Sequence, residues 1–184
     1  MLIRPCTPAD LPAVQAIYAH AVDHGTGTFE TVAPTVPEMR QRFDGVAALG
    51  LPWLVARDEA HQILGYAYAG WLRPRQAFRY CVEDSVYIAP QAQGQGVGSA
   101  LLAELMARCT QAGSRQMVAM IGDSANLGSI RLHERAGFVR AGLVASAGWK
   151  FGRWLDLVIW QKALGAGDST SAQPAAADGR APDR

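Results

Sequence analysis

The chain has 184 residues, of which 49% are hydrophobic and 18% are charged. This length suits a single domain with a hydrophobic core of its own. The 17 basic and 16 acidic side chains leave a net charge of +1, which argues against binding nucleic acid through a basic surface. No run of about 18 apolar residues occurs, and the opening MLIRP lacks signal-peptide character, so we expect a cytoplasmic protein that does not engage a membrane.

The predicted elements mix helices with strands that do not alternate regularly. A strand at 2–4 precedes a helix whose start, Thr7-Pro-Ala-Asp10, offers a cap, a proline for the first turn and a negative charge at the helix N-terminus. Apolar residues at helical spacing continue this helix to Ala21. The later elements are a loop at 24–35, a helix at 37–49, strands at 53–57, 63–72 and 80–88, a helix at 98–112, a strand at 116–121, a helix at 126–135, and strands at 138–145 and 154–160. This order predicts an α+β fold around a mixed, largely antiparallel sheet.

The last part of the chain differs in composition from the rest. Residues 165–184 contain no large apolar side chain, so they cannot bury enough surface to offset the entropy of ordering. We therefore expect a folded domain at 1–164 and a disordered tail at 165–184.

The cysteines do not indicate a disulfide framework or a metal site. Cys6, Cys81 and Cys109 are odd in number, widely spaced and without a C-x-x-C partner. We expect three buried free thiols and no bound metal.

A glycine-rich turn joins the strand at 80–88 to the helix at 98–112. Its sequence, Gln93-Gly-Gln-Gly-Val-Gly98, lets the backbone approach an anion, and the helix start supplies free N–H groups. A P-loop needs a lysine after the last glycine, and Ser99 stands there instead. A dinucleotide fingerprint needs glycine at that same position and an acidic residue about 20 positions later, and both are missing. The turn is thus predicted to bind a phosphate or pyrophosphate, but it is neither a P-loop nor a dinucleotide-binding turn.

The spacing Q-x-x-G-x-G, formed by Gln93, Gly96 and Gly98, resembles the acetyl-CoA pyrophosphate loop of the GNAT N-acetyltransferases. Further blocks resemble the phosphinothricin acetyltransferase branch of that superfamily, which includes methionine sulfoximine and methionine sulfone acetyltransferases. In family order, these blocks are Gly25–Glu30, Pro52–Ala56, Gly65–Gly70, Val82–Ile88, Val118–Gly122, Asn126–Glu134, Gly148–Gly152 and Trp154–Gln161. Together they are much more specific than the glycine turn.

The resemblance implies a GNAT acyl-CoA N-acyltransferase fold, with a central sheet flanked by helices. It also implies a homodimeric enzyme that transfers acetyl from acetyl-CoA directly to the α-amine of a small glutamate-like amino acid. Cofactor binding then falls to a strand that pairs with the pantetheine arm, to the pyrophosphate loop, and to an asparagine at the next helix start, where an N-cap is the compatible alternative. The matching residues are Val86, Tyr87, Ile88, Gly94, Gln95, Gly96, Val97, Gly98, Ser99 and Asn126.

Two side chains are candidates for proton transfer. Glu83 matches the family's general base, and its strand is apolar enough to be central, which would raise the pKa of the carboxyl. The alternative is a solvated Glu83 at a sheet edge, or one paired with Arg79. His133 matches a position that lines the family's active site, although a lone histidine on a helix is more often packed or capped.

The acceptor is expected to meet the polar break that precedes the strand at 80–88. Arginine binds a carboxylate or phosphinate as a planar bidentate donor, so Arg75 is the preferred anion anchor, with Phe78 and Tyr80 as walls. Arg73 and Arg79 are expected to be solvated.

The loop at 24–35 carries one large aromatic residue, Phe29. In the family this loop can close over the site, from the same or the neighbouring subunit. A plain surface loop is the alternative.

The group that protonates the departing thiolate stays open. Many GNAT enzymes have a tyrosine after the last motif, whereas the matching residue here is Phe138, which has no proton to give. Ser129 and Tyr87 are candidates, and unassisted departure is also consistent with a thiol pKa of about 8.5.

Two rival functions fit the same residues. One is acetyl transfer to a different amine, such as a polyamine, an ordinary amino acid or a peptide N-terminus. The other is an acyl-CoA-binding module without catalysis.

Overall fold

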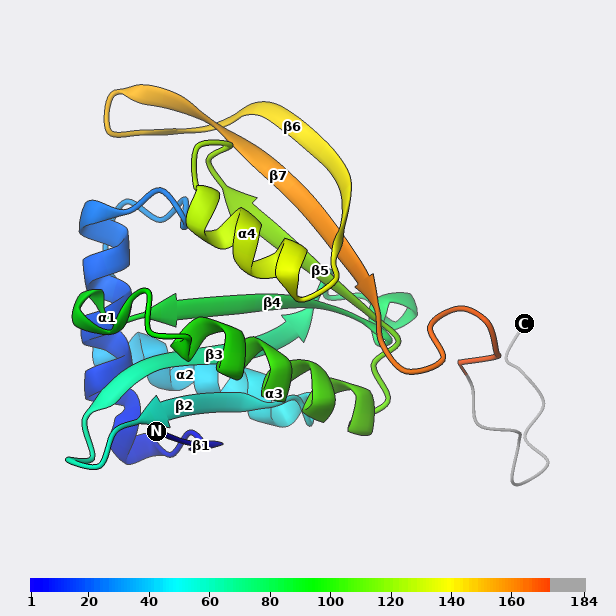
Figure 1. Ribbon diagram of the computed structural model, residues 1–184, viewed down its shortest axis with the longest axis horizontal. Helices are drawn as coiled ribbons and strands as arrows, with labels where there is room; N and C mark the ends of the chain where they lie inside the picture. Colours follow the sequence, from blue (N-terminus) through cyan, green and yellow to red (C-terminus); the bar gives the residue numbers. More distant parts are fainter. Residues whose placement is uncertain (173–184) are drawn as a thin grey trace.

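Within residues 1–172, which the computed structural model describes, seven strands form one mixed sheet in the order β1-β2-β3-β4-β5-β7-β6 (Figure 1). The strands are β1 Leu2–Pro5, β2 Trp53–Arg57, β3 Ile63–Trp71, β4 Cys81–Ile88, β5 Gln116–Gly122, β6 Val139–Lys150 and β7 Arg153–Ala163. The helices are α1 Leu11–His24, α2 Val36–Ala48, α3 Val97–Gln111 and α4 Leu127–Arg135, and short 3-10 turns occupy η1 Pro8–Asp10, η2 Gln76–Phe78 and η3 Pro90–Ala92.

The predicted α+β architecture is confirmed. Neighbouring strands are antiparallel except for β4 and β5, which run parallel. Helices α3 and α4 cover one face of the sheet, and α1 and α2 cover the other (Figure 1). The apolar side chains of α1 that the helical spacing singles out, among them Leu11, Val14 and Ile17, are buried against the sheet. The helix itself continues past the predicted end at Ala21 to His24.

Strand β6 is longer than the sequence predicts. We expected it to end near Ala145, whereas it continues to Lys150 and pairs with the start of β7. Its register shifts between Val144 and Gly148, and such a bulge interrupts the alternation by which a strand is recognised. The extension brings Lys150 to the loop that follows α1.

The two central strands diverge. The parallel pairing of β4 with β5 runs only from Cys81 to Asp84 of β4. Beyond Asp84, β4 pairs with β3 alone and β5 with β7 alone among the described residues, and the two strands open as a V (Figure 1). Along residues 85–88, the edge of β4 that faces β5 therefore carries backbone groups that pair with no other strand, although β4 lies in the middle of the sheet.

Residues 165–172 are held against the domain. Arg115 Nε donates a hydrogen bond of 2.8 Å to the carbonyl oxygen of Gly167. This segment and Tyr80 line a cavity of about 410 Å³ near the start of β5. The rest of the segment expected to be disordered, 173–184, lies outside the described residues.

The three cysteines carry free thiols. Cys6 and Cys109 are buried as expected, and burial raises the pKa of each thiol to about 12, so both stay protonated. Cys81, the first residue of β4, is only half-buried, which differs from the expectation. In residues 1–172, no helix is long and apolar enough to cross a bilayer, and no three His, Cys, Asp or Glu side chains gather as a metal site would require.

Candidate active site

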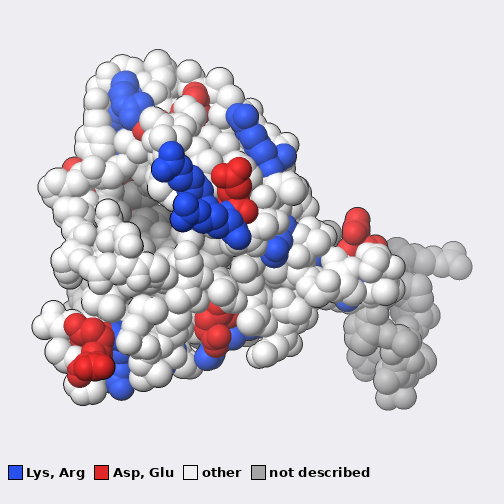
Figure 2. All heavy atoms as spheres, in the orientation of Figure 1, with Lys and Arg blue, Asp and Glu red and all other residues white. Residues whose placement is uncertain are grey.

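The surface is hollowed between α4 and the turn that precedes α3, and basic side chains lie over α4 beside the hollow (Figure 2). The exposed arginines of α4 are Arg131 and Arg135. In the turn, Gly94 and Gly96 have φ values of 74° and 80°, in the left-handed region that favours glycine. No described atom lies within 4 Å of where a Cβ would stand on either glycine. The backbone of the turn is therefore open to a ligand.

Helix α3 begins directly after this turn, with Gly96 as its cap and no acidic residue in its first turn. Its first N–H groups have no partner within the helix, which makes the helix start suitable for a pyrophosphate. At Gly98 a Cβ would lie 3.5 Å from Leu132 of α4 and 3.7 Å from Ile88 of β4. The helix start thus packs against α4 and against the end of β4.

Asn126 caps α4 and ties it to the end of β5. Its Oδ1 accepts a hydrogen bond from the Ser129 N–H at 3.2 Å, and its Nδ2 donates to the Gly122 carbonyl at 3.4 Å. The predicted N-cap is confirmed. The residues that the family resemblance assigned to the cofactor lie at the end of β4, in the turn before α3, at the start of α3 and at the cap of α4. Val97 is buried, whereas the others are half-buried or exposed: Val86, Tyr87, Ile88, Gly94, Gln95, Gly96, Gly98, Ser99 and Asn126.

Glu83 is half-buried at the point where β4 and β5 diverge. Because Asp84 points toward α4, the alternation of a strand turns Glu83 to the opposite face, where α1 and α2 lie. Its register partner on β3 is Gly70, and no described atom stands within 4 Å of where a Cβ of Gly70 would be. Burial raises the pKa of Glu83, the adjacent Asp84 carboxylate raises it further, and Arg73 opposes the change. A carboxyl of raised pKa beside open space is suited to take a proton from a ligand.

His133 is buried and paired with Asp84. Its Nε2 lies 3.0 Å from Asp84 Oδ2, and its Nδ1 lies 2.8 Å from the Ser129 carbonyl oxygen. A carboxylate and a carbonyl oxygen both accept hydrogen bonds, so the two contacts favour a ring that is protonated on both nitrogens. Burial lowers the pKa of His133, but the hydrogen bond and charge of Asp84 outweigh burial and raise it. His133 also packs edge-on to Phe138, with ring centroids 5.1 Å apart.

Asp84 was not among the residues predicted from the sequence. The pattern that could have indicated Asp84 is a second carboxylate, next to Glu83, in an otherwise apolar central strand. One of its oxygens, Oδ1, is buried without a hydrogen-bond partner among the described residues.

The three arginines before β4 differ in their surroundings: Arg73 is exposed, as expected from the sequence. Arg75 is exposed and makes no side-chain hydrogen bond or ion pair within residues 1–172, whereas Arg73 is the arginine whose charge reaches Glu83. Arg79 is half-buried rather than solvated and lies over the ring of Tyr80, 4.4 Å from its centroid. Tyr80 lines the cavity near the start of β5, away from Glu83, and Phe78 is half-buried in η2.

The loop that carries Phe29 is packed rather than free. A Cβ on Gly148 of β6 would lie 2.3 Å from the Phe29 ring, so the ring rests on that glycine. The buried Thr28 hydroxyl pairs with Tyr18 of α1 at 2.9 Å. Next to them, Glu30 forms a bidentate ion pair with Arg42 of α2 at 2.7 and 3.0 Å.

Two hydroxyl groups remain candidates for protonating the thiolate. The ring of Tyr87 packs edge-on against Tyr18, and burial raises its pKa well above that of an ordinary tyrosine, so it stays protonated. Ser129 Oγ lies 3.4 Å from His133 Nδ1. Tyr87 belongs to β4, one of the diverging strands, and Ser129 belongs to α4.

Comparison with known proteins gives concordant results. The model of the Acetyltransferase (GNAT) family matches residues 15–138. The phosphinothricin N-acetyltransferase of Alcaligenes faecalis is 53% identical and covers 91% of this chain and 85% of its own length. The L-methionine sulfoximine/L-methionine sulfone acetyltransferase of Pseudomonas paraeruginosa is 42% identical over 94% of this chain and 98% of its own. A crystal structure of a GNAT superfamily phosphinothricin acetyltransferase from Sinorhizobium meliloti in complex with AcCoA superimposes with a TM-score of 0.91 at 43% identity, covering 96% of this chain and 95% of that one.

Proposed function

Because the chain belongs to the GNAT acetyltransferase family, we propose that it transfers acetyl from acetyl-CoA to the α-amine of a small glutamate-like amino acid, such as phosphinothricin or methionine sulfoximine or sulfone. The two relatives are named for these acceptors, and the solved relative binds acetyl-CoA. The observation that carries the proposal is the half-buried Glu83, which stands beside open space at the mouth of the diverging strands.

The hollow fits acetyl-CoA. Gly94 and Gly96 leave the backbone of the turn bare, and the start of α3 offers N–H groups for the pyrophosphate. The unpaired edge of residues 85–88 offers main-chain hydrogen bonds for the pantetheine arm. Arg131 and Arg135 add positive charge beside the hollow. When bound, acetyl-CoA supplies the acetyl group as an activated thioester.

Glu83 makes the acceptor amine reactive. An α-amine is mostly protonated at neutral pH, and it cannot attack a carbonyl until a base removes a proton. With that proton on Glu83, the nitrogen lone pair attacks the thioester carbonyl and forms the new C–N bond, the C–S bond breaks, and the sulfur leaves with the bonding electrons. The nitrogen then carries one proton too many and releases it to water, which leaves the neutral amide. Tyr87 or Ser129 then protonates the sulfur, or the thiolate leaves as such.

Arg73 is the better anchor for the acid group of the acceptor. Its positive charge opposes the raised pKa of Glu83, so a guanidinium that acts on Glu83 is a candidate to bind the carboxylate of an acceptor whose amine meets that residue. Arg75, the anchor expected from the sequence, lies in the same exposed segment and is the rival in a direct test.

A second copy of the chain is the proposed partner. The tip of the β6–β7 hairpin exposes 57% of Trp149, 54% of Phe151 and 61% of Trp154, with the two tryptophan rings 5.3 Å apart. Adjacent exposed aromatic side chains at one tip are typical of a surface that a partner covers. Light scattering should give a dimer for the wild type and a shift toward monomer for Trp154→Ser, and a monomeric wild type would contradict the proposal.

Thiol release measured with a panel of acceptors tests the proposed function. We expect turnover with phosphinothricin, methionine sulfoximine and methionine sulfone, and weak turnover with polyamines and peptide N-termini. Faster turnover with one of those amines or with an ordinary amino acid would favour a different acceptor. Acetyl-CoA binding in calorimetry without thiol release from any amine would favour a binding module.

A further inference from the structure

Lys150 is a buried ammonium that binds backbone instead of a carboxylate. Only 4% of the residue is exposed, and its Nζ donates hydrogen bonds to the carbonyl oxygens of Gly25 at 2.8 Å and Thr28 at 2.9 Å. It forms no ion pair within residues 1–172. Burial lowers the pKa of Lys150, and the more distant negative charges of Asp23 and Glu30 oppose this change. A charged side chain is rarely buried without a charged partner, so the burial of Lys150 indicates a specific role.

The two carbonyls belong to the loop that follows α1, and other contacts fix the same loop. At Gly122, the last residue of β5, a Cβ would lie 2.3 Å from the Thr26 carbonyl oxygen. The Phe29 ring touches Gly148 of β6 in the same way. Residues 25–30 are thus held against the ends of two strands, and both contact points are glycines where a side chain would push the loop away.

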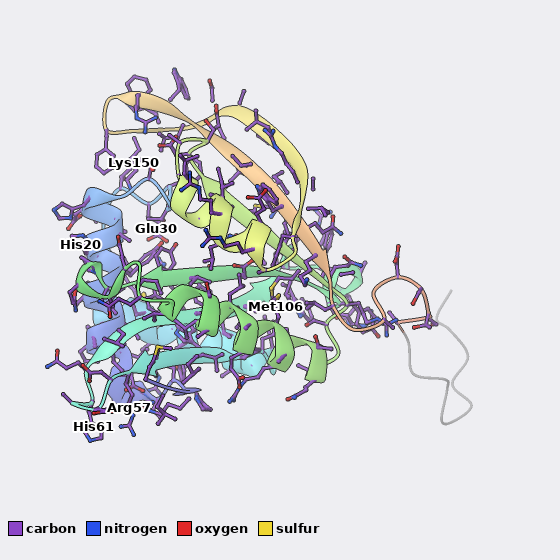
Figure 3. The ribbon with its side chains drawn as sticks, in the orientation of Figure 1. His20, Glu30, Arg57, His61, Met106 and Lys150 are labelled. Carbon is purple, nitrogen blue, oxygen red and sulfur yellow. The ribbon has the colours of Figure 1, made fainter. Side chains whose placement is uncertain are left out.

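The loop lies on the acceptor side of the diverging strands. Thr28 bonds to Tyr18, whose ring packs on Tyr87 of β4, and Tyr87 faces the same side of the sheet as Glu83 because the two are separated by an even number of positions. Figure 3 shows Lys150 and Glu30 on the same side of the molecule, where α1 ends, and their charges interact.

We propose that Lys150 is a positioning residue that holds residues 25–30 closed as one wall of the acceptor site, so that acceptor affinity depends on this contact. The identity of the acceptor in this inference rests on the proposed function. That Lys150 holds the loop rests only on its hydrogen bonds to Gly25 and Thr28. A buried cation bound to two carbonyls contributes strong, charge-assisted hydrogen bonds that water cannot replace while the loop is closed.

The test compares two variants of nearly equal length. Lys150→Met removes every donor, and Lys150→Gln keeps an N–H donor without the charge. Lys162→Met, at the other lysine of the chain, is the matched control, because its Nζ makes no hydrogen bond or ion pair in the described residues. Hydrogen exchange of residues 25–30 is measured without ligands, and KM for the acceptor is measured beside the dissociation constant for acetyl-CoA.

In Lys150→Met we expect faster exchange confined to residues 25–30 and a rise of about tenfold or more in acceptor KM, with acetyl-CoA affinity unchanged. Lys150→Gln should recover part of both effects, and Lys162→Met should behave as the wild type. Exchange in Lys150→Met that matches the wild type, or that accelerates throughout the sheet with KM unchanged, would overturn the proposal.

A second variant covers the case in which Lys150→Met does not fold. Gly148→Ala leaves Lys150 in place and pushes on the Phe29 ring, so it should loosen the same residues, and Phe29→Ala in that background should restore their protection. If the wild type acetylates no acceptor, the proposed function fails, while the exchange results still decide whether Lys150 holds the loop.

Discussion

The side chains of Asp84 and His133 form a buried ion pair between β4 and α4, with Asp84 Oδ2 3.0 Å from His133 Nε2. It joins one of the two diverging strands to the helix whose start carries Asn126. The pair therefore fixes the distance between two walls of the proposed cofactor site. His133, which the family resemblance placed in the active site, thus also holds α4 against β4.

Removing either partner should destabilise the protein by about 3 kcal/mol, since the other is left as a buried unpaired charge. His133→Gln and Asp84→Asn should each show this loss near pH 6, and the double variant should lose less than the sum. The pKa of His133 is raised on folding, so its stabilising contribution is full below the unfolded value of about 6.5 and is lost as pH rises through the folded value. Urea unfolding at several pH values measures this, and a stability difference between wild type and His133→Gln that stays constant with pH would contradict the assignment.

Glu83→Gln should lower kcat by about 10²- to 10⁴-fold while the fold and acetyl-CoA affinity persist. Because burial and Asp84 raise the pKa of Glu83, the acid limb of kcat/KM should lie above the ordinary pKa of a glutamate and should vanish in the variant. Glu59→Gln, at the exposed turn between β2 and β3, is the matched control. Turnover near that of the wild type across the pH range would exclude Glu83 as the base.

The sequence predicted the parts of this site that are local. The glycine turn, the capping Asn126 and the carboxyl of Glu83 each carry their signal in a few adjacent residues. The contact of Lys150 with Thr28 joins residues 122 positions apart, and it exists only because β6 continues beyond a bulge that conceals its length. The pairing of His133 with residue 84 spans 49 positions and likewise depends on packing that no local pattern records.

Gly96→Ala should weaken acetyl-CoA binding about fivefold or more, because the added methyl enters the open space at the start of α3. Gly113→Ala is a close control: Gly113 has φ +89°, is also free of neighbours within 4 Å, and lies just beyond the end of the same helix. Both changes should cost about 1 kcal/mol of stability through left-handed strain. Calorimetry should find weaker binding only for Gly96→Ala, and equal binding in the two variants would contradict the role of the turn.

Gly70→Val should block the acceptor without disturbing the cofactor. Gly70 pairs with Glu83, and the space beside it is open, so a β-branched side chain fits the strand but fills the volume in front of the carboxyl. We expect acceptor KM to rise about tenfold or more, with acetyl-CoA affinity unchanged. Gly142→Val, where a Cβ would meet only Ile159, is the strand control. An unchanged KM in Gly70→Val would place the acceptor elsewhere.

The roles of Arg73 and Arg75 can be distinguished by measuring the pH dependence of kcat/KM and the acceptor KM in two alanine variants. Arg73→Ala removes a positive charge that opposes the raised pKa of Glu83, so the acid limb of kcat/KM should move to higher pH, whereas Arg75→Ala should leave the limb in place. If Arg73 also binds the acid group, its loss should raise KM by about tenfold or more for acceptors with a carboxylate and much less for a simple amine. A shifted limb with KM unchanged would make Arg73 an electrostatic neighbour only. A rise in KM only in Arg75→Ala would indicate that Arg75 binds the acid group, as the sequence predicts.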